Sequence, residues 1–427
     1  MKRESPEEQR KQMLEAPIPG LIGRLAVPTI ISMLVTSIYN MADTYFVSHI
    51  GAGDGATSAS GAVSIVFSLM AIIQAVGFTV GMGAGSITSR LLGKGWKERA
   101  DQYASSAVIL GLVLGLLLMS VCFVWIDELV WLLGATPTIY PYALDYARYI
   151  IFGAPVMILA YILNNLLRWQ GKASLSVFGL ATGGILNMIL DPIFIFGYCG
   201  EALSGTTGAA VATVIGQFCG AGMTLFFNLN KNPDIQISFK GFRPSAKAIG
   251  RIYTVGLPSI AMQCVGSLMT FGMNLILMSF SATAVAVFGV YFKLQSFVFM
   301  PIFGLNNGMV PIISYNYGAR RPDRVKKTIK LAVCYAECIV LIGFCIFQFA
   351  PDKVLGIFAA SDAMLAIGIP AMRIICLHFL LAGASIVLSS VFQALGNGVF
   401  SLIVSVCRQL FVLLPAAWLL AQTGNVN

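Results

Sequence analysis

The sequence predicts an all-α polytopic membrane protein built from two six-helix lobes, related by pseudo-twofold symmetry as parallel repeats. Three observations predict this fold: the composition, the long apolar segments, and an internal repeat. The chain has 427 residues, of which 57% are hydrophobic and 11% are charged. Soluble globular domains carry about 25% charged residues, so the composition excludes an ordinary soluble protein.

Eleven segments have the length of a membrane helix, which needs about 20 predominantly apolar residues. Polar, glycine-rich or proline-containing stretches separate them. Two lobes of six helices require twelve segments, so the last helix of the second lobe is expected to be missing from this chain. The segments centre near Met33, Ala71, Leu114, Met157, Leu186, Ile215, Ser267, Phe299, Val340, Leu381 and Leu410.

The two halves of the chain resemble each other. Residues 147–172 match 372–397 without a gap, and the glycine pair in 81–85 matches the pair in 304–308. The offset between matching positions is about 225 residues, far longer than the period of a solenoid repeat. Six helices per repeat leave both halves facing the same way. Parallel repeats of this kind, with a site near the membrane midplane, are typical of secondary transporters.

The repeat also predicts the organisation of the chain. We expect a cytoplasmic N-terminal segment (1–15), a first lobe of six helices (16–229), a cytoplasmic linker (230–250), and a second lobe with five helices present (251–427).

The basic residues predict the orientation. Most of the 27 Lys and Arg residues lie in alternate connections: the N-terminus and residues 90–99, 168–172, 231–251 and 320–330. The positive-inside rule places these connections, and the N-terminus, in the cytoplasm. We therefore expect a multi-pass membrane protein with a cytoplasmic N-terminus. The expected location is the plasma (inner) membrane of a bacterium. The net charge of +9 is explained by these loops, and no nucleic-acid partner is expected.

Cysteine and histidine usage argues against a bound cofactor. The nine cysteines lie mostly in apolar runs without a C-x-x-C pair, and the only histidines are His49 and His378. These residues supply a zinc or haem site poorly. No nucleophilic triad or phosphate-binding loop is visible either, so an enzyme is not expected.

One apolar stretch, 183–196, contains only two polar side chains, Asn187 and Asp191. They are four residues apart and so share one face of a helix. A carboxylate near the centre of a bilayer costs about 2.5–3.5 kcal/mol. Pro192 removes a backbone donor beside it, which loosens the helix and makes this position a candidate hinge.

The first span has a similar set, Tyr39, Asn40 and Asp43. Two membrane carboxylates, each with a nearby asparagine, predict a site for a proton or a metal cation. The alternative is that Asp191 only caps a helix end beside Pro192.

Further polar, methionine and aromatic residues within the apolar segments are candidates for lining a substrate cavity. The alternative is that the polar ones hydrogen-bond a neighbouring helix, and that the others face lipid or the core. Two charges inside spans of the second lobe, Lys293 and Arg408, could contact substrate or extend toward the membrane surface. The substrate candidates are Gln74, Asn164, Asn165, Asn274, Gln295, Asn306, Met269, Met273 and Phe299.

Several motifs taken together resemble the multidrug and toxic compound extrusion (MATE) transporters, over the whole length of the chain. The stretch 295–306, with 315–320, looks like the MepA-like branch of bacterial multidrug exporters. The matching stretches of the first lobe are 25–28, 39–47, 183–192 and 208–213.

The resemblance implies two lobes around a cavity that opens alternately to either side. It implies antiport, in which a cationic or amphipathic drug leaves as Na⁺ or H⁺ enters, with no other cofactor. The cation site of the family falls on Asp43, Asn187, Asp191 and Thr213 of this sequence, and Asp43 and Asp191 would be the metal ligands if the ion is Na⁺. Pro28 would allow the first helix to bend. The expected partners are drug-like cations and membrane lipid, and the expected state is a monomer.

The sequence departs from part of the family in the second lobe. Some members use an acidic residue in the first helix of that lobe. Here Gln263 lies in that neighbourhood, and no acid occurs between Asp234 and Asp323, which favours a cation site in the first lobe.

A second function remains open, a flippase of a related fold for a lipid-linked precursor. Such proteins tend to line their cavity with several basic residues, for which Lys293 and Arg408 are the only candidates here.

Overall fold

The computed structural model describes residues 5–47, 54–195, 198, 205–238, 245–356 and 362–422. Within these ranges, side chains are described except at 36–47, 54–60, 64, 263, 282, 286 and 363.

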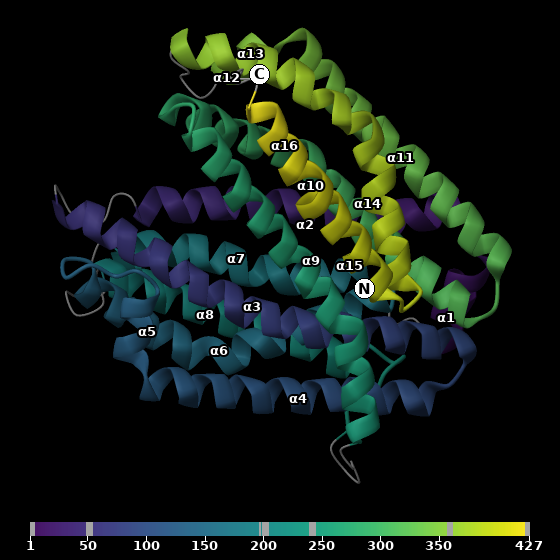
Figure 1. Cartoon of the computed structure of the whole chain (residues 1–427). Coiled ribbons are helices and arrows are strands. Elements are labelled where there is room, and N and C mark those ends of the chain that lie inside the picture. The colour runs from purple at the N-terminus through teal and green to yellow at the C-terminus, as the bar shows by residue number, and fades with distance from the viewer. Residues whose placement is uncertain are drawn as a thin grey trace. The chain divides into compact units, whose positions relative to one another are not determined.

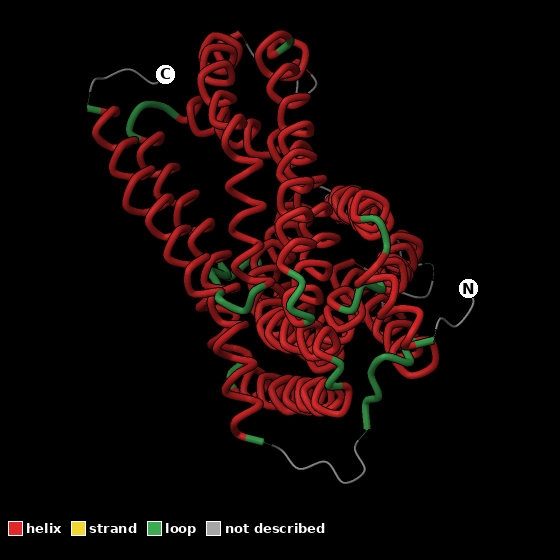
Figure 2. Tube along the Cα trace, turned by 90° about the vertical axis from the view of Figure 1, so that its right-hand side faces the viewer, coloured by secondary structure: helices red, strands yellow, loops and turns green. Residues whose placement is uncertain are grey.

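The described chain is almost entirely helical and contains no strand (Figures 1 and 2). The helices of the first half are α1 (Pro6–Glu15), α2 (Ile18–Val47), α3 (Asp54–Lys94), α4 (Lys97–Val124), α5 (Ile126–Leu132), α6 (Tyr140–Trp169), α7 (Ala173–Ile195) and α8 (Gly205–Phe226), which a π-helical turn extends over Phe227–Lys231. Those of the second half are α9 (Ala246–Met278), α10 (Ala282–Gly318), α11 (Pro322–Phe349), α12 (Pro351–Gly356), α13 (Asp362–Ile375), α14 (Phe379–Ala394), α15 (Gly398–Val406) and α16 (Leu414–Ala421).

Eleven of the described helical segments are long and apolar enough to cross a membrane, which confirms the predicted number. Two of them are interrupted. A 3₁₀ turn, Cys376–His378, separates α13 from α14, and a π-helical turn, Cys407–Leu413, separates α15 from α16. Each pair still forms one span, Met364–Ala394 and Gly398–Ala421.

The chain folds into two compact units. Unit 1 comprises Met1–Leu14 and Leu34–Gly256, and unit 2 comprises Glu15–Met33 and Leu257–Asn427. This division differs from the predicted lobes at the first helix of each half. The start of α2 belongs with the second half of the chain, and the start of α9 belongs with the first half.

Helix α6 is the centre of unit 1, where α3, α4 and α8 pack around it (Figure 1). Its contact with α3 depends on glycines spaced four residues apart. A Cβ added at Gly77 would lie 2.8 Å from Tyr161 Cβ, and one at Gly81 would lie 3.0 Å from Asn165 Cβ. At Gly85 it would lie 2.5 Å from Trp169 Cδ1. These separations show that the two helices approach as closely as small residues allow.

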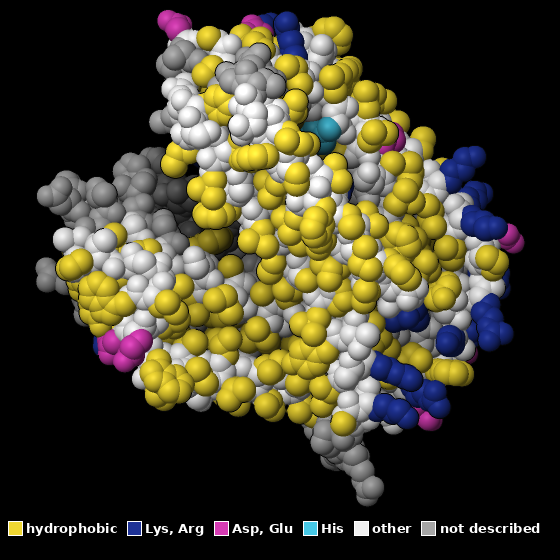
Figure 3. Space-filling view, viewed as in Figure 1, with side chains coloured by type: hydrophobic (Ala, Val, Ile, Leu, Met, Phe, Trp, Pro, Cys, Tyr) yellow, Lys and Arg dark blue, Asp and Glu magenta, His cyan; other side chains and the backbone are white. Residues whose placement is uncertain are grey.

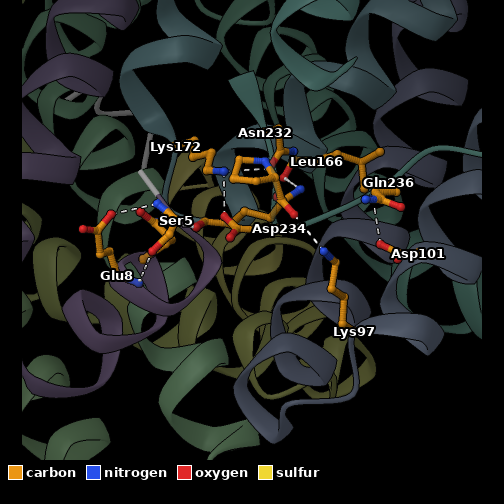
Figure 4. A network of polar contacts seen from close by, with 12 residues as sticks. Ser5, Glu8, Lys97, Asp101, Leu166, Lys172, Asn232, Asp234 and Gln236 are labelled. Carbon is orange, nitrogen blue, oxygen red and sulfur yellow. Dashed lines mark hydrogen bonds and ion pairs between the residues drawn. The ribbon is translucent and has the colours of Figure 1, made fainter. Parts of the chain in front are cut away.

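The segment before α9 is anchored to unit 1 by a buried polar network (Figure 4). Lys172 Nζ lies 2.6 Å from Asp234 Oδ2, and their side chains are only 9% and 6% exposed. The same ammonium donates to Asn232 Oδ1 at 2.7 Å. Nearby, Lys97 Nζ donates to the Pro233 carbonyl at 2.9 Å. The network therefore fixes the linker onto the start of α4 and onto the connection that follows α6.

The N-terminal segment also belongs to unit 1. Helix α1 begins with a capping box, in which Ser5 and Glu8 each accept the other's backbone N–H. Gln9 Nε2 then donates to the Gln170 carbonyl at 3.1 Å. Met13 is 1% exposed and packs on Gly171.

In unit 2, α2 crosses α10 at two glycines. A Cβ at Gly304 would lie 2.6 Å from Ile30 Cα, and one at Gly308 would lie 2.5 Å from the Ala26 nitrogen. Thr29 Oγ1 donates to the Gly304 carbonyl at 2.6 Å. These contacts lie directly beside Pro28 in α2.

Hydrophobic side chains cover much of the outer surface of the helices (Figure 3). Among the most exposed are Leu132 at 83% and Phe349 at 78%. Such exposure is costly in water, and it fits helices that face lipid.

Candidate functional site

The predicted residues of the first lobe meet in a buried cluster between α7 and α8. Asn187 Nδ2 donates to Asp191 Oδ1 at 3.0 Å, as the four-residue spacing predicts. The same nitrogen lies 3.4 Å from Thr213 Oγ1 on α8. The three residues are 2%, 0% and 3% exposed. The structure thus brings together the two polar residues of α7 and the threonine of α8.

Close packing of the two helices positions this cluster. A Cβ added at Gly183 would lie 2.7 Å from the Gly216 carbonyl oxygen, and one at Gly220 would lie 3.2 Å from the Gly179 carbonyl oxygen. Because glycine allows backbones to approach this closely, the side chains one turn further along can reach each other. The sequence signal was present in the four-residue spacing of these glycines on both helices, and our sequence analysis did not use it.

The donor set of the cluster suits a hard cation. Its three residues carry carboxylate, amide and hydroxyl oxygens, which are the ligands that cations such as Na⁺ prefer, and in this structure the amide nitrogen of Asn187 faces the other two side chains. Asn187 Oδ1 is buried and has no hydrogen-bond partner in the described structure. A buried acceptor without a donor is costly, and a bound cation would satisfy it. Within the described residues, which do not include His49, no three His, Cys, Asp or Glu side chains form a metal-binding group.

The other predicted coupling residues, Tyr39, Asn40 and Asp43, lie on α2. Their side chains fall outside the described part of the chain, so their position relative to Asp191 stays a prediction. Pro192 lies within α7, directly after Asp191, where it cannot donate a backbone hydrogen bond.

Two of the three substrate candidates in unit 1, Asn164 and Asn165, form hydrogen bonds with other residues of the protein. Asn164 Nδ2 donates to the Ser176 carbonyl at 2.8 Å, and the Ser176 hydroxyl donates to Asn164 Oδ1 at 2.9 Å. Asn165 is 1% exposed, donates to the Tyr161 carbonyl at 2.8 Å and accepts from Arg168. The contacts of Asn164 match the alternative interpretation, that such residues hydrogen-bond a neighbouring helix, whereas those of Asn165 stay within α6. Gln74 is exposed.

The remaining candidates lie in unit 2. Phe299 is 6% exposed and packs edge-on against Phe379, with ring centroids 5.2 Å apart, so it belongs to the core. Asn306 is 5% exposed, and its Oδ1 has no hydrogen-bond partner among the described residues. The half-buried ones are Asn274, Gln295, Met269 and Met273.

Lys293 and Arg408 are both exposed, and neither forms an ion pair with a described residue. Glu337 on α11, a membrane-segment carboxylate that our sequence analysis did not consider, accepts a hydrogen bond from the Ala384 backbone N–H at 2.7 Å.

The fold and this site define the class of protein: a multi-pass membrane transporter with a duplicated helical architecture. Comparison with known proteins identifies the family. The MatE family model matches residues 28–193 and 258–419, one stretch in each half. The chain belongs to the MatE family of multidrug efflux transporters, which are not enzymes, and the resemblance seen in the sequence is confirmed.

Similar proteins agree with this assignment. The chain is 26% identical to the multidrug export protein MepA of Staphylococcus haemolyticus over 414 residues, covering 97% of this chain and 89% of that protein. A MepA of Staphylococcus aureus strain N315 is 26% identical over 392 residues, 92% of this chain and 85% of that protein.

Solved structures share the fold. A MOP superfamily transporter from Pyrococcus furiosus has a TM-score of 0.86 at 28% identity, with 96% of this chain and 90% of that chain covered. An outward-facing multidrug resistance MATE transporter has a TM-score of 0.86 at 29% identity, with the same coverage.

Proposed function

We propose that the protein is a secondary active antiporter that exports cationic or amphipathic drugs in exchange for Na⁺ or H⁺. The observation that carries this proposal is the buried polar cluster of Asn187, Asp191 and Thr213, in which Asn187 Oδ1 lacks a partner among the described residues. A carboxylate inside a membrane helix is expensive, and it is retained where it binds an ion or a proton.

In this proposal, ion binding at Asp191 and drug binding are alternative states of one cycle. When the ion occupies the cluster, the Asp191 charge is compensated and the buried Asn187 Oδ1 gains an electropositive partner. Asp43 contributes a second carboxylate, and α2 bends at Pro28 between states. Inward movement of one positive charge releases about 2.3 kcal/mol per 100 mV of membrane potential, which contributes to drug export.

The proposal extends to orientation and state. The basic connections and the N-terminus face the cytoplasm of a plasma membrane, and the protein acts as a monomer. The multidrug export function named for the MepA relatives supports the substrate class.

The test is transport of a fluorescent cationic dye by everted membrane vesicles, with Na⁺ and pH gradients imposed separately. We expect one gradient to drive dye uptake by the wild type and thereby name the ion. Asp191→Asn, and likewise Asp43→Asn, should reduce gradient-driven uptake at least tenfold. Asp352→Asn, at an exposed position of α12, is the matched control and should behave as wild type.

Dye uptake by Asp191→Asn at the wild-type rate would refute the coupling role. Absence of dye movement under either gradient would favour the flippase, and transport of a lipid-linked precursor would then be measured.

A further inference from the structure

Glu337 lies near the middle of a membrane-spanning helix. It follows the first residue of α11, Pro322, by 15 positions and precedes the last, Phe349, by 12. At about 1.5 Å per residue these intervals correspond to about 22 Å and 18 Å. A carboxylate at such a depth is expensive and is commonly found where a protein binds or carries an ion.

The carboxylate has one close polar contact, and it comes from the backbone. Glu337 Oε1 accepts a hydrogen bond from the Ala384 N–H of α14 at 2.7 Å. A Cβ added at the preceding residue, Gly383, would lie 2.9 Å from the same oxygen. Glycine at this position therefore leaves the room that the carboxylate occupies.

No cation balances the charge of Glu337 within the described structure. Glu337 forms no ion pair with a described residue, although basic residues occur on other elements of the same unit. Helix α14 carries no titratable side chain. The candidates elsewhere are Lys293 on α10, His378 in the 3₁₀ turn and Arg408 in the π-helical turn, and none lies within 4.0 Å. Arg373 of α13 makes no such pair either.

The first half of the chain shows that helix packing does not require this carboxylate. With the repeat offset of about 225 residues, Glu337 corresponds to Leu112 and Gly383 corresponds to Ile158. At that crossing a Cβ on Gly111 would meet the side chains of Ile162 and Ile158. Leu112 itself is 45% exposed, so α4 and α6 pack through Gly111 and apolar side chains without a carboxylate at the matching position.

We propose that Glu337 is a proton-binding site of the second half, protonated and deprotonated once in each transport cycle. The inference rests on the proposed antiport and adds a second ion site to it. The ligand is a proton, because one carboxylate beside a backbone N–H offers too few oxygen ligands for Na⁺. The cluster of Asn187, Asp191 and Thr213 offers more oxygen ligands. The proton adds to the carboxylate from one side of the membrane and leaves to the other, with no other bond made or broken.

Two variants separate proton binding from packing. Glu337→Gln keeps the shape and the oxygen that accepts the Ala384 N–H, but it cannot titrate. Glu337→Leu carries the residue of the first half and loses both properties. Purified protein is reconstituted into proteoliposomes, and uptake of a cationic dye is measured with a pH gradient and with a Na⁺ gradient. Dye affinity in detergent is measured from pH 5 to pH 9.

We expect Glu337→Gln to lose at least tenfold of the pH-driven uptake and to show a dye affinity that varies less with pH than that of the wild type. Its thermal stability should stay close to wild type. Wild-type pH-driven uptake together with a wild-type pH profile of affinity in Glu337→Gln would overturn the inference and leave Glu337 as a packing residue. Absence of ion-driven uptake by the wild type itself would instead refute the antiport, and this inference with it.

Discussion

The substitution Gly216→Ala tests whether close packing of α7 on α8 builds the proposed ion site. A Cβ at this position would lie 2.7 Å from the Gly183 carbonyl oxygen and 3.0 Å from Asn187 Cβ. Ordinary contacts of a Cβ begin at 3.4 Å, so the helices must separate by about 0.7 Å to accept the methyl group.

That separation is large compared with the tolerance of the site. The Asn187 Nδ2 to Thr213 Oγ1 distance is already 3.4 Å, near the upper limit for a hydrogen bond. Moving α8 away by about 0.7 Å removes the hydroxyl from the cluster. Overpacking of this kind costs about 1–3 kcal/mol of stability, and loss of one ligand at about 1.4 kcal/mol weakens ion binding about tenfold.

The assay is gradient-driven dye uptake at equal membrane abundance, with the ion concentration for half-maximal uptake as the readout. Gly222→Ala is the matched control, because this glycine is on the same helix and a Cβ there would meet nothing within 4 Å. We expect Gly216→Ala to need about tenfold more ion and Gly222→Ala to need the wild-type concentration. Equal ion dependence and equal thermal stability of the two variants would refute the reasoning.

Two further predictions concern polar contacts within unit 1. Asp234→Asn leaves the buried Lys172 ammonium without its counter-charge, so the free energy of unfolding should fall by about 3–5 kcal/mol. The double variant Lys172→Met, Asp234→Leu should recover most of the lost stability. A double variant no more stable than Asp234→Asn in thermal unfolding would contradict this prediction. Asn164→Ala removes two hydrogen bonds to Ser176 and should lower stability by about 1–2 kcal/mol without changing the KM for dye. A raised KM at unchanged stability would instead place Asn164 in the substrate path.

The spans were predictable from sequence because each one is decided by its own residues. Twenty apolar residues cross a bilayer whatever their neighbours are, and all eleven predicted segments occur in the described chain. The pairing of Asn187 with Asp191 was predictable for the same reason, since a four-residue spacing fixes the relative position of two side chains on one helix.

Contacts between helices were harder to predict because they depend on register. Thr213 lies beside Asn187 where the glycines of α7 and α8 pack together, and the family resemblance rather than the residues themselves placed Thr213 in the predicted site. Glu337 lies on α11, outside the first helix of the second lobe, where some members of the family carry an acidic residue. The backbone amide that it contacts lies 47 residues further along the chain.

The first helix of each half of the chain, α2 or α9, begins in one compact unit and ends in the other. The part of α2 up to Met33 packs on α10 at Gly304 and Gly308, and α2 belongs to unit 1 from Leu34 onward. Pro28 and Asp43 therefore lie on one helix but in different units. An ion that draws Asp43 toward Asp191 would therefore exert its effect on unit 2 through the covalent continuity of α2. Pro28 lies within the segment of α2 that packs on α10, between Ala26 and Ile30, so a bend at Pro28 would change the contacts of this segment with Gly304 and Gly308. The same argument applies to α9, which changes units between Gly256 and Leu257 beside Pro258. In both halves a proline lies close to the point where the first helix passes between units, so in the proposed antiport cycle these two helices are the covalent links through which ion binding in unit 1 would act on unit 2.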